Sequence, residues 1–60
     1  MNDVGTLVRE LREAREEIEK AEQLLLDGGR RRAVEHLGRA NVLAHGVRRA
    51  LKSLLSRRVA

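Results

Sequence analysis

The feature that most constrains this chain is a pair of apolar heptad repeats separated by the dipeptide Gly28-Gly29. In each repeat the apolar residues are spaced alternately three and four apart, the pattern of α-helices that pack along a shared seam. The repeats comprise Val4, Leu7, Leu11, Ala14, Ile18, Ala21 and Leu25, and then Ala33, Leu37, Ala40, Ala44, Val47, Leu51 and Leu54. Glycine is the usual residue just past a helix end. The sequence therefore predicts an all-α fold: one domain, residues 1–60, built as an antiparallel two-helix hairpin with helices at about 3–27 and 30–57.

The two repeats match each other when the chain folds back at the glycine pair. In every layer the numbers of the facing residues then add up to 58. Leu25 faces Ala33, Ala21 faces Leu37, Ile18 faces Ala40, Ala14 faces Ala44, Leu11 faces Val47, Leu7 faces Leu51 and Val4 faces Leu54. Large side chains face small ones near the turn, whereas large faces large further away. We therefore expect the two arms to lie close together at the turn and further apart at the other end.

A hairpin of this size needs stabilisation beyond its own seam. A chain of about 60 residues buries only about 60% of its unfolded surface, and small domains usually add disulfides, a metal or a partner chain. The chain has no Cys, so a second copy is the remaining choice, and a four-helix bundle of two hairpins would bury the apolar residues outside the seam. We expect a homodimer whose self-association or partner face comprises Val8, Leu24, Leu26, Val34, Leu43, Ala50 and Leu55. The alternative is that these are scattered surface residues, which are common.

Charge is distributed unequally between the two halves. Residues 1–27 carry eight acidic and four basic residues, and residues 28–60 carry one acidic and nine basic residues. Attraction between the halves favours the hairpin, although an exposed pair contributes only about 0.2–1 kcal/mol. The basic half also predicts contact with an anionic partner, either an acidic protein surface or nucleic acid. The candidate contact residues are Arg30, Arg31, Arg32, Arg48, Arg49, Arg57 and Arg58, which could equally be solvated or paired within the chain.

No arrangement typical of an enzyme or of a metal site occurs in the sequence. His36 and His45 are nine residues apart, which does not place them on one helix face. Neither Ser53 nor Ser56 has a His within a helical turn, and no Gly-rich loop follows a strand. We therefore expect a non-enzymatic protein with no cofactor, no metal and no small-molecule substrate.

The location of the protein is predicted from two sequence features. Residues 1–5 lack the basic start and apolar run of a signal peptide. No stretch approaches the roughly 20 apolar residues of a membrane-spanning helix. We expect a soluble, cytoplasmic protein.

Gly38 and Gly46 lie within the second predicted helix, where each glycine costs about 1 kcal/mol relative to alanine. One interpretation is the close approach of another backbone, as at a dimer contact. The other is a break near Gly46 that would make three helices. The unbroken heptad through Ala44, Val47 and Leu51 favours a continuous helix.

The middle of the chain resembles a tetratricopeptide-type helical hairpin. Small residues occur at the spacings of that repeat, namely Ala21, Gly28, Ala33 and Ala40. The segments Glu16-Glu17-Ile18, Glu22, Leu24-Leu25, Gly28 and Val34-Glu35-His36-Leu37, with Ala40, are similar to the cytosolic domain of the mitochondrial outer-membrane import receptor family. The resemblance covers about 25 of the 60 residues. It implies a helical hairpin that binds proteins, with Ile18 alone carrying over as a residue of that family's presequence groove.

Overall fold

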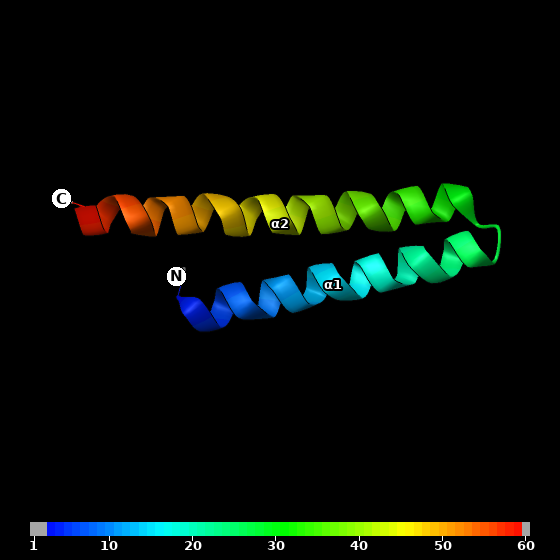
Figure 1. Ribbon diagram of the computed structural model, residues 1–60, viewed down its shortest axis with the longest axis horizontal. Helices are drawn as coiled ribbons and strands as arrows, with labels where there is room; N and C mark the ends of the chain where they lie inside the picture. The colour runs from blue at the N-terminus through cyan, green and yellow to red at the C-terminus, as the bar shows by residue number, and fades with distance from the viewer. Residues whose placement is uncertain (1–2, 60) are drawn as a thin grey trace.

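The computed structural model describes residues 3–59, with side chains through Arg57, and these residues form two α-helices joined by a short turn. Helix α1 spans Val4–Leu26 and helix α2 spans Arg30–Val59. The helices pack against each other in antiparallel directions (Figure 1). The predicted all-α hairpin is thus confirmed, with helix bounds within two residues of those expected. Helix α2 continues through Gly46, which confirms the continuous helix over the three-helix alternative.

Helix α1 begins at a side-chain cap. Asp3 has an extended backbone, and its Oδ1 accepts a hydrogen bond from the backbone N–H of Thr6 at 2.8 Å. This bond satisfies one of the N–H groups that a helix start leaves without a partner. It also holds the pKa of the Asp3 carboxyl below its ordinary value. The cap fixes where the first heptad repeat starts.

The turn between the helices is closed by two backbone hydrogen bonds that need glycine. Gly28 has φ +86°, a left-handed conformation that other residues rarely adopt. Its N–H donates to the carbonyl of Leu25 at 3.2 Å, and the N–H of Gly29 donates to the carbonyl of Leu24 at 2.6 Å. This pair of bonds is the Schellman motif that ends many helices. A Cβ at Gly29 would lie 3.2 Å from Leu24 Cδ2, so a side chain there would require Leu24 to shift by a few tenths of an ångström, whereas Gly28 is required by its backbone conformation.

The contact between the helices is centred on one residue per heptad of each helix, which we name the buried row. It consists of Leu7, Ala14, Ala21, Ala33, Ala40 and Val47, each at most 5% exposed. Four of the six are alanines, and the three nearest the turn on the two helices, Ala21, Ala33 and Ala40, are all small. Small side chains allow helix axes to approach closely. Figure 1 shows that the helices lie nearest each other at the turn and diverge toward the N-terminus of α1, as expected from the sequence.

The predicted pairing is wrong for the residues of the heptad seam that lie outside the buried row. Four residues after each position of the buried row lies a second row, which we name the exposed row. It consists of Leu11, Ile18, Leu25, Leu37, Ala44 and Leu51, together with Val4, which lies seven residues before Leu11 and so occupies the same heptad position. Its six large members are 44–71% exposed. Each predicted layer therefore combines one residue that faces the other helix with one that faces solvent.

The rotation of each helix about its axis explains this correction. A third set of positions lies three residues after the buried row and is half-buried. It includes Glu17, Leu24, His36 and Leu43. On a helix, positions three and four residues away lie on opposite sides of a given residue. In the hairpin, the positions three residues after the buried row are turned toward the other helix of the same chain. The exposed row, four residues after the buried row, is therefore turned outward.

No helix within the described residues is long and apolar enough to cross a membrane. This finding agrees with the predicted absence of a membrane span.

Candidate interaction surface

The exposed row forms the centre of a continuous apolar surface. Val8, Val34 and Leu55 extend it, because each lies three or four residues from a member of the exposed row on the same helix. These three side chains are 39%, 68% and 60% exposed. We name this surface, the exposed row plus Val8, Val34 and Leu55, the apolar face.

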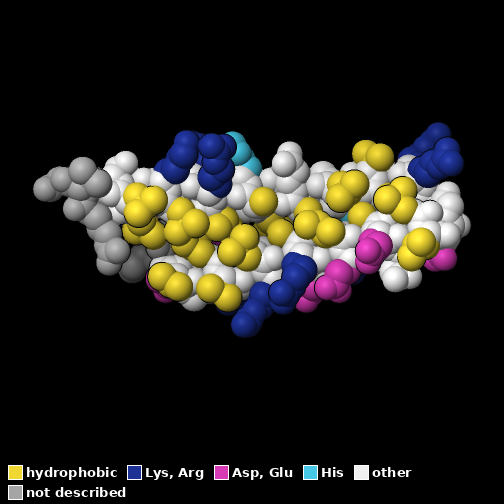
Figure 2. All heavy atoms as spheres, in the orientation of Figure 1, with side chains coloured by type: hydrophobic (Ala, Val, Ile, Leu, Met, Phe, Trp, Pro, Cys, Tyr) yellow, Lys and Arg dark blue, Asp and Glu magenta, His cyan; other side chains and the backbone are white. Residues whose placement is uncertain are grey.

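The two helices contribute to the same side of the hairpin. In antiparallel helices that pack through equivalent rows, the positions four residues later lie on one side of the pair on both helices, and those three residues later lie on the other. Figure 2 shows the result as a band of hydrophobic side chains that runs along both helices, with basic and acidic groups at its edges. The apolar face is therefore one surface and not two separate stripes.

The opposite side of the hairpin, the polar face, holds a cluster of charged groups around Glu17. Glu17 Oε2 lies 2.5 Å from His36 Nδ1 across the two helices, and Glu17 Oε1 lies 3.9 Å from Lys20 Nζ and 4.0 Å from Arg39 Nη1. The hydrogen bond with His36 is the main reason that the pKa of the Glu17 carboxyl is lowered; desolvation opposes it, and the charges of Lys20, His36 and Arg39 each add a smaller lowering effect. The cluster therefore holds the helices together on this side through polar contacts.

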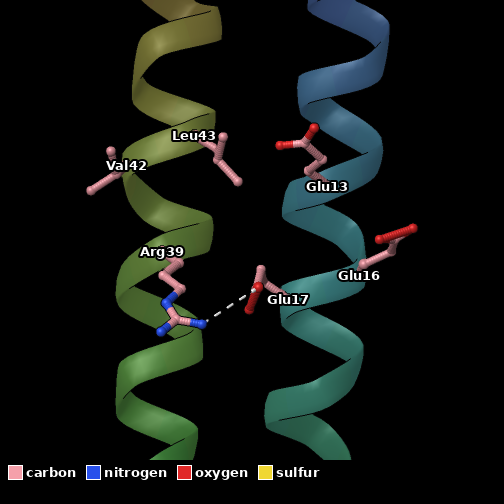
Figure 3. A pocket seen from close by; sticks show the side chains of 6 residues that line it. All are labelled: Glu13, Glu16, Glu17, Arg39, Val42 and Leu43. Atoms are coloured by element: carbon pink, nitrogen blue, oxygen red, sulfur yellow. Dashed lines mark ion pairs between the residues drawn. The ribbon is translucent and has the colours of Figure 1, made fainter.

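Beside this cluster the polar face has an open groove between the helices (Figure 3). Leu43 and Glu13 point toward the facing helix, whereas Val42 and Glu16 point away from the groove. Glu17 and Arg39 complete the lining, with their ion pair crossing the groove. The groove is open, and its lining combines three carboxylates and one arginine with two aliphatic side chains.

The residues predicted for self-association divide between the two faces. Val8, Val34 and Leu55 lie on the apolar face. Leu24, Leu43 and Ala50 are half-buried and line grooves on the polar face. Leu26 is 75% exposed at the end of α1, where it points about 100° away from Leu25 around the helix.

The residues that sequence reasoning missed are the large members of the exposed row. The sequence assigned them to the seam inside the hairpin. The signal that could have found them is the width of the apolar pattern. Two rows four residues apart, joined by Val8, Val34 and Leu55, cover a wider arc of the helix than one partner helix can bury.

The predicted anionic-partner residues are exposed but do not share a face. The side chains of Arg30, Arg31, Arg32, Arg48, Arg49 and Arg57 are all exposed, and that of Arg58 lies outside the described residues. Consecutive helical residues point about 100° apart, so each run of arginines spreads around α2. The spread gives no single basic surface that could follow a phosphate backbone.

Within residues 3–57, no three His, Asp or Glu side chains are grouped so that they could hold a metal ion. On the polar face Glu17 is paired with His36, Lys20 and Arg39. Most of the large exposed aliphatic side chains lie on the apolar face.

No protein-family model, no curated protein and no solved structure matches this chain. The resemblance to a tetratricopeptide-type hairpin therefore stays a prediction, and the function has to be argued from the surface itself.

Proposed function

We propose that this chain is a non-enzymatic helical interaction module that self-associates through the apolar face, with an adaptor or assembly role. The observation that carries the proposal is the size difference between the two rows. The hairpin buries mostly alanines, while six of the seven residues in the exposed row are large aliphatic side chains. Burying a Val or Leu side chain stabilises a protein by about 1.5–3 kcal/mol, so most of the available apolar burial lies on the apolar face.

A second copy of the chain is the occupant that fits this surface. The hairpin measures 50 × 16 × 14 Å, so one broad side offers a footprint on the order of 800 Å², the area that each partner contributes to a typical stable complex. A second hairpin has the same length and the same apolar band. Two copies packed through these bands form a four-helix bundle, the arrangement that covers the large side chains of both.

Sedimentation equilibrium over micromolar concentrations tests the proposal. We expect a mass above that of the 6.8 kDa chain, and we expect Ile18→Gln to raise the dissociation constant tenfold or more, since central interface residues often contribute about 2 kcal/mol. Val42→Gln is the matched control, because Val42 is 71% exposed but lies away from the apolar face. A helical parent that stays a 6.8 kDa monomer would overturn the proposal.

The predicted alternative, a basic nucleic-acid-binding protein that uses α2, has weaker support. Its arginines are exposed, as such a role requires, but they point around the helix. The chain also has no aromatic residues for stacking on bases. Steep loss of duplex binding between low and physiological salt, by the parent but not by a variant lacking Arg48 and Arg49, would favour the alternative.

A further inference from the structure

The outer edge of α1 carries a charge pattern that would pair opposite charges if two copies of this edge lay antiparallel to each other. Arg12, Arg15, Glu19 and Glu22 follow one another at spacings of three and four, so they lie along one side of α1. All four are exposed. Each lies one or four residues after Leu11 or Ile18 of the exposed row, which places it at the border of the apolar face. Along this edge, from the N-terminus of α1 toward the turn, two basic residues are therefore followed by two acidic residues.

The outer edge of α2 is basic at both of its ends, with uncharged residues between them. Arg31 lies near the turn, Gly38 and Asn41 follow it, and Arg48 and Lys52 lie far from the turn. All five are exposed. The two edges of the apolar face thus differ, because only the edge of α1 carries both signs of charge.

A second copy can cover the apolar face in two symmetric ways. With both turns at the same end, α1 lies beside α2 of the second copy. Glu17 is level with His36 in the hairpin, so Arg12 and Arg15 then lie level with Asn41 and Gly38, and Glu22 lies level with Arg31.

With the turns at opposite ends, α1 lies antiparallel to α1 of the second copy, so that Arg12 and Arg15 meet Glu22 and Glu19. In this second arrangement Arg48 and Lys52 lie beyond the start of the other α2.

We propose that two copies pack through their apolar faces with their turns at opposite ends, and that the charge order along Arg12, Arg15, Glu19 and Glu22 selects this orientation. The inference rests on the proposed function, since it requires self-association through the apolar face. By symmetry the opposite-end arrangement brings together four pairs of opposite charges, whereas the same-end arrangement brings together two, and charge complementarity favours the arrangement with more such pairs.

Two charge-reversal variants test the orientation. The acidic-edge variant combines Arg12→Glu with Arg15→Glu, and the basic-edge variant combines Glu19→Arg with Glu22→Arg. All four positions are exposed, so helicity measured by circular dichroism stays as in the parent. We expect each variant alone to self-associate about ten-fold or more weakly, since four attractive pairs become repulsive. An equimolar mixture should recover parent-like affinity, because an all-acidic edge then meets an all-basic one.

A matched control separates this effect from a change in net charge. Glu13→Arg with Glu16→Arg changes the charge as much as the basic-edge variant does, but these residues line the groove of the polar face. We expect the control to associate nearly as the parent does in moderate salt. The effect of the edge variants should also fade as salt is raised.

The same measurements distinguish the ways in which the inference can fail. If the basic-edge variant associates more weakly than the parent while the acidic-edge variant does not, Glu22 lies beside Arg31 of the second copy, and the turns lie at the same end. If neither edge variant differs from the control, edge charge does not select the orientation. Both results overturn the inference while the proposed function stands, whereas a monomeric parent overturns the two together.

A spin label at the turn gives an independent measurement. The chain has no Cys, so Asp27→Cys provides one labelling site per copy. Opposite orientation places the two labels roughly 35 Å apart, the length of α1 at 1.5 Å per residue. Two labels adjacent to each other would overturn the inference.

Discussion

The buried row and the exposed row lie four residues apart on both helices, and both repeat every seven residues, yet they differ in side-chain size. Ala21, Ala33 and their equivalents in the buried row are mostly small, whereas Leu11, Ile18 and their equivalents in the exposed row are mostly large. The small residues let the helices of one chain approach closely, but they bury little apolar area. The difference shows that this chain forms the hairpin mainly through small residues and leaves most of its large aliphatic side chains exposed, where the proposed second copy would cover them.

Leucine substitutions of Ala14 and Ala44 should give the largest difference between the two rows. Ala14 is 5% exposed in the buried row, and Ala44 is exposed. We expect Ala14→Leu to lower the free energy of unfolding by about 1–3 kcal/mol, because an overpacked core forces the helices apart. Ala44→Leu should change it by less than about 0.5 kcal/mol. The measurement is thermal unfolding at a concentration that keeps the chain monomeric.

Equal destabilisation by the two substitutions would contradict this comparison. It would mean that residue 44 lies between the helices, and it would restore the predicted pairing of Ala14 with Ala44.

Substitution of Gly28 tests whether the turn holds the two rows in their relative positions. We expect Gly28→Ala to cost about 1–2 kcal/mol, because an L-residue at φ +86° brings its Cβ close to the following carbonyl. The matched change Gly38→Ala should stabilise the hairpin by up to about 1 kcal/mol, since a Cβ there meets no atom within 4 Å. Urea unfolding of both variants checks the contrast, and a neutral Gly28→Ala would show that the turn contributes little.

Acid titration of Glu17 tests the contribution of the polar face and should have the smallest effect. The pKa of Glu17 lies below its ordinary value of 4.5, mainly because of its hydrogen bond with His36. A carboxyl whose pKa is lower in the folded state stabilises the protein at pH values above its unfolded-state pKa. That stabilisation is lost as the pH falls through its folded-state pKa. We expect the urea midpoint to fall less steeply between pH 5 and pH 3 in Glu17→Gln than in the parent or in a Glu13→Gln control. An identical pH dependence in all three would mean that Glu17 gains nothing from the cluster.

The fold was predictable from the sequence because its signals are local. The heptad spacing and the Gly28-Gly29 break depend only on residues near one another in the chain, and so do the helix bounds. The identity of the outward-facing surface was not predictable in the same way. Both apolar rows obey the same repeat, so the spacing alone does not tell which row meets the other helix of the same chain.

The rotation that decides between the rows depends on contacts formed only after the chain folds back. The contact between Glu17 and His36 joins residues 19 positions apart, and the turn geometry at Gly28 sets the angle from which α2 starts. Neither is visible as a periodicity. For this reason the sequence placed Leu24, Leu43 and Ala50 on the self-association face and left out Ile18 and its neighbours in the exposed row.

The short turn also affects how quickly the chain can find its structure. With only residues 27–29 between the helices, the first contacts between α1 and α2 close a very small loop, and loops of about ten residues close in roughly 10–100 ns. Later contacts can form in order along the arms, so the search within one chain is finished within microseconds to milliseconds, as in other helical proteins with local contacts. Encounter of two chains at about 10⁵–10⁷ M⁻¹s⁻¹ takes on the order of 0.1–10 s at micromolar concentration. In the proposed self-association the single hairpin is therefore a transient species before its apolar face is covered, and the lifetime of that species is set by protein concentration and not by the chain itself.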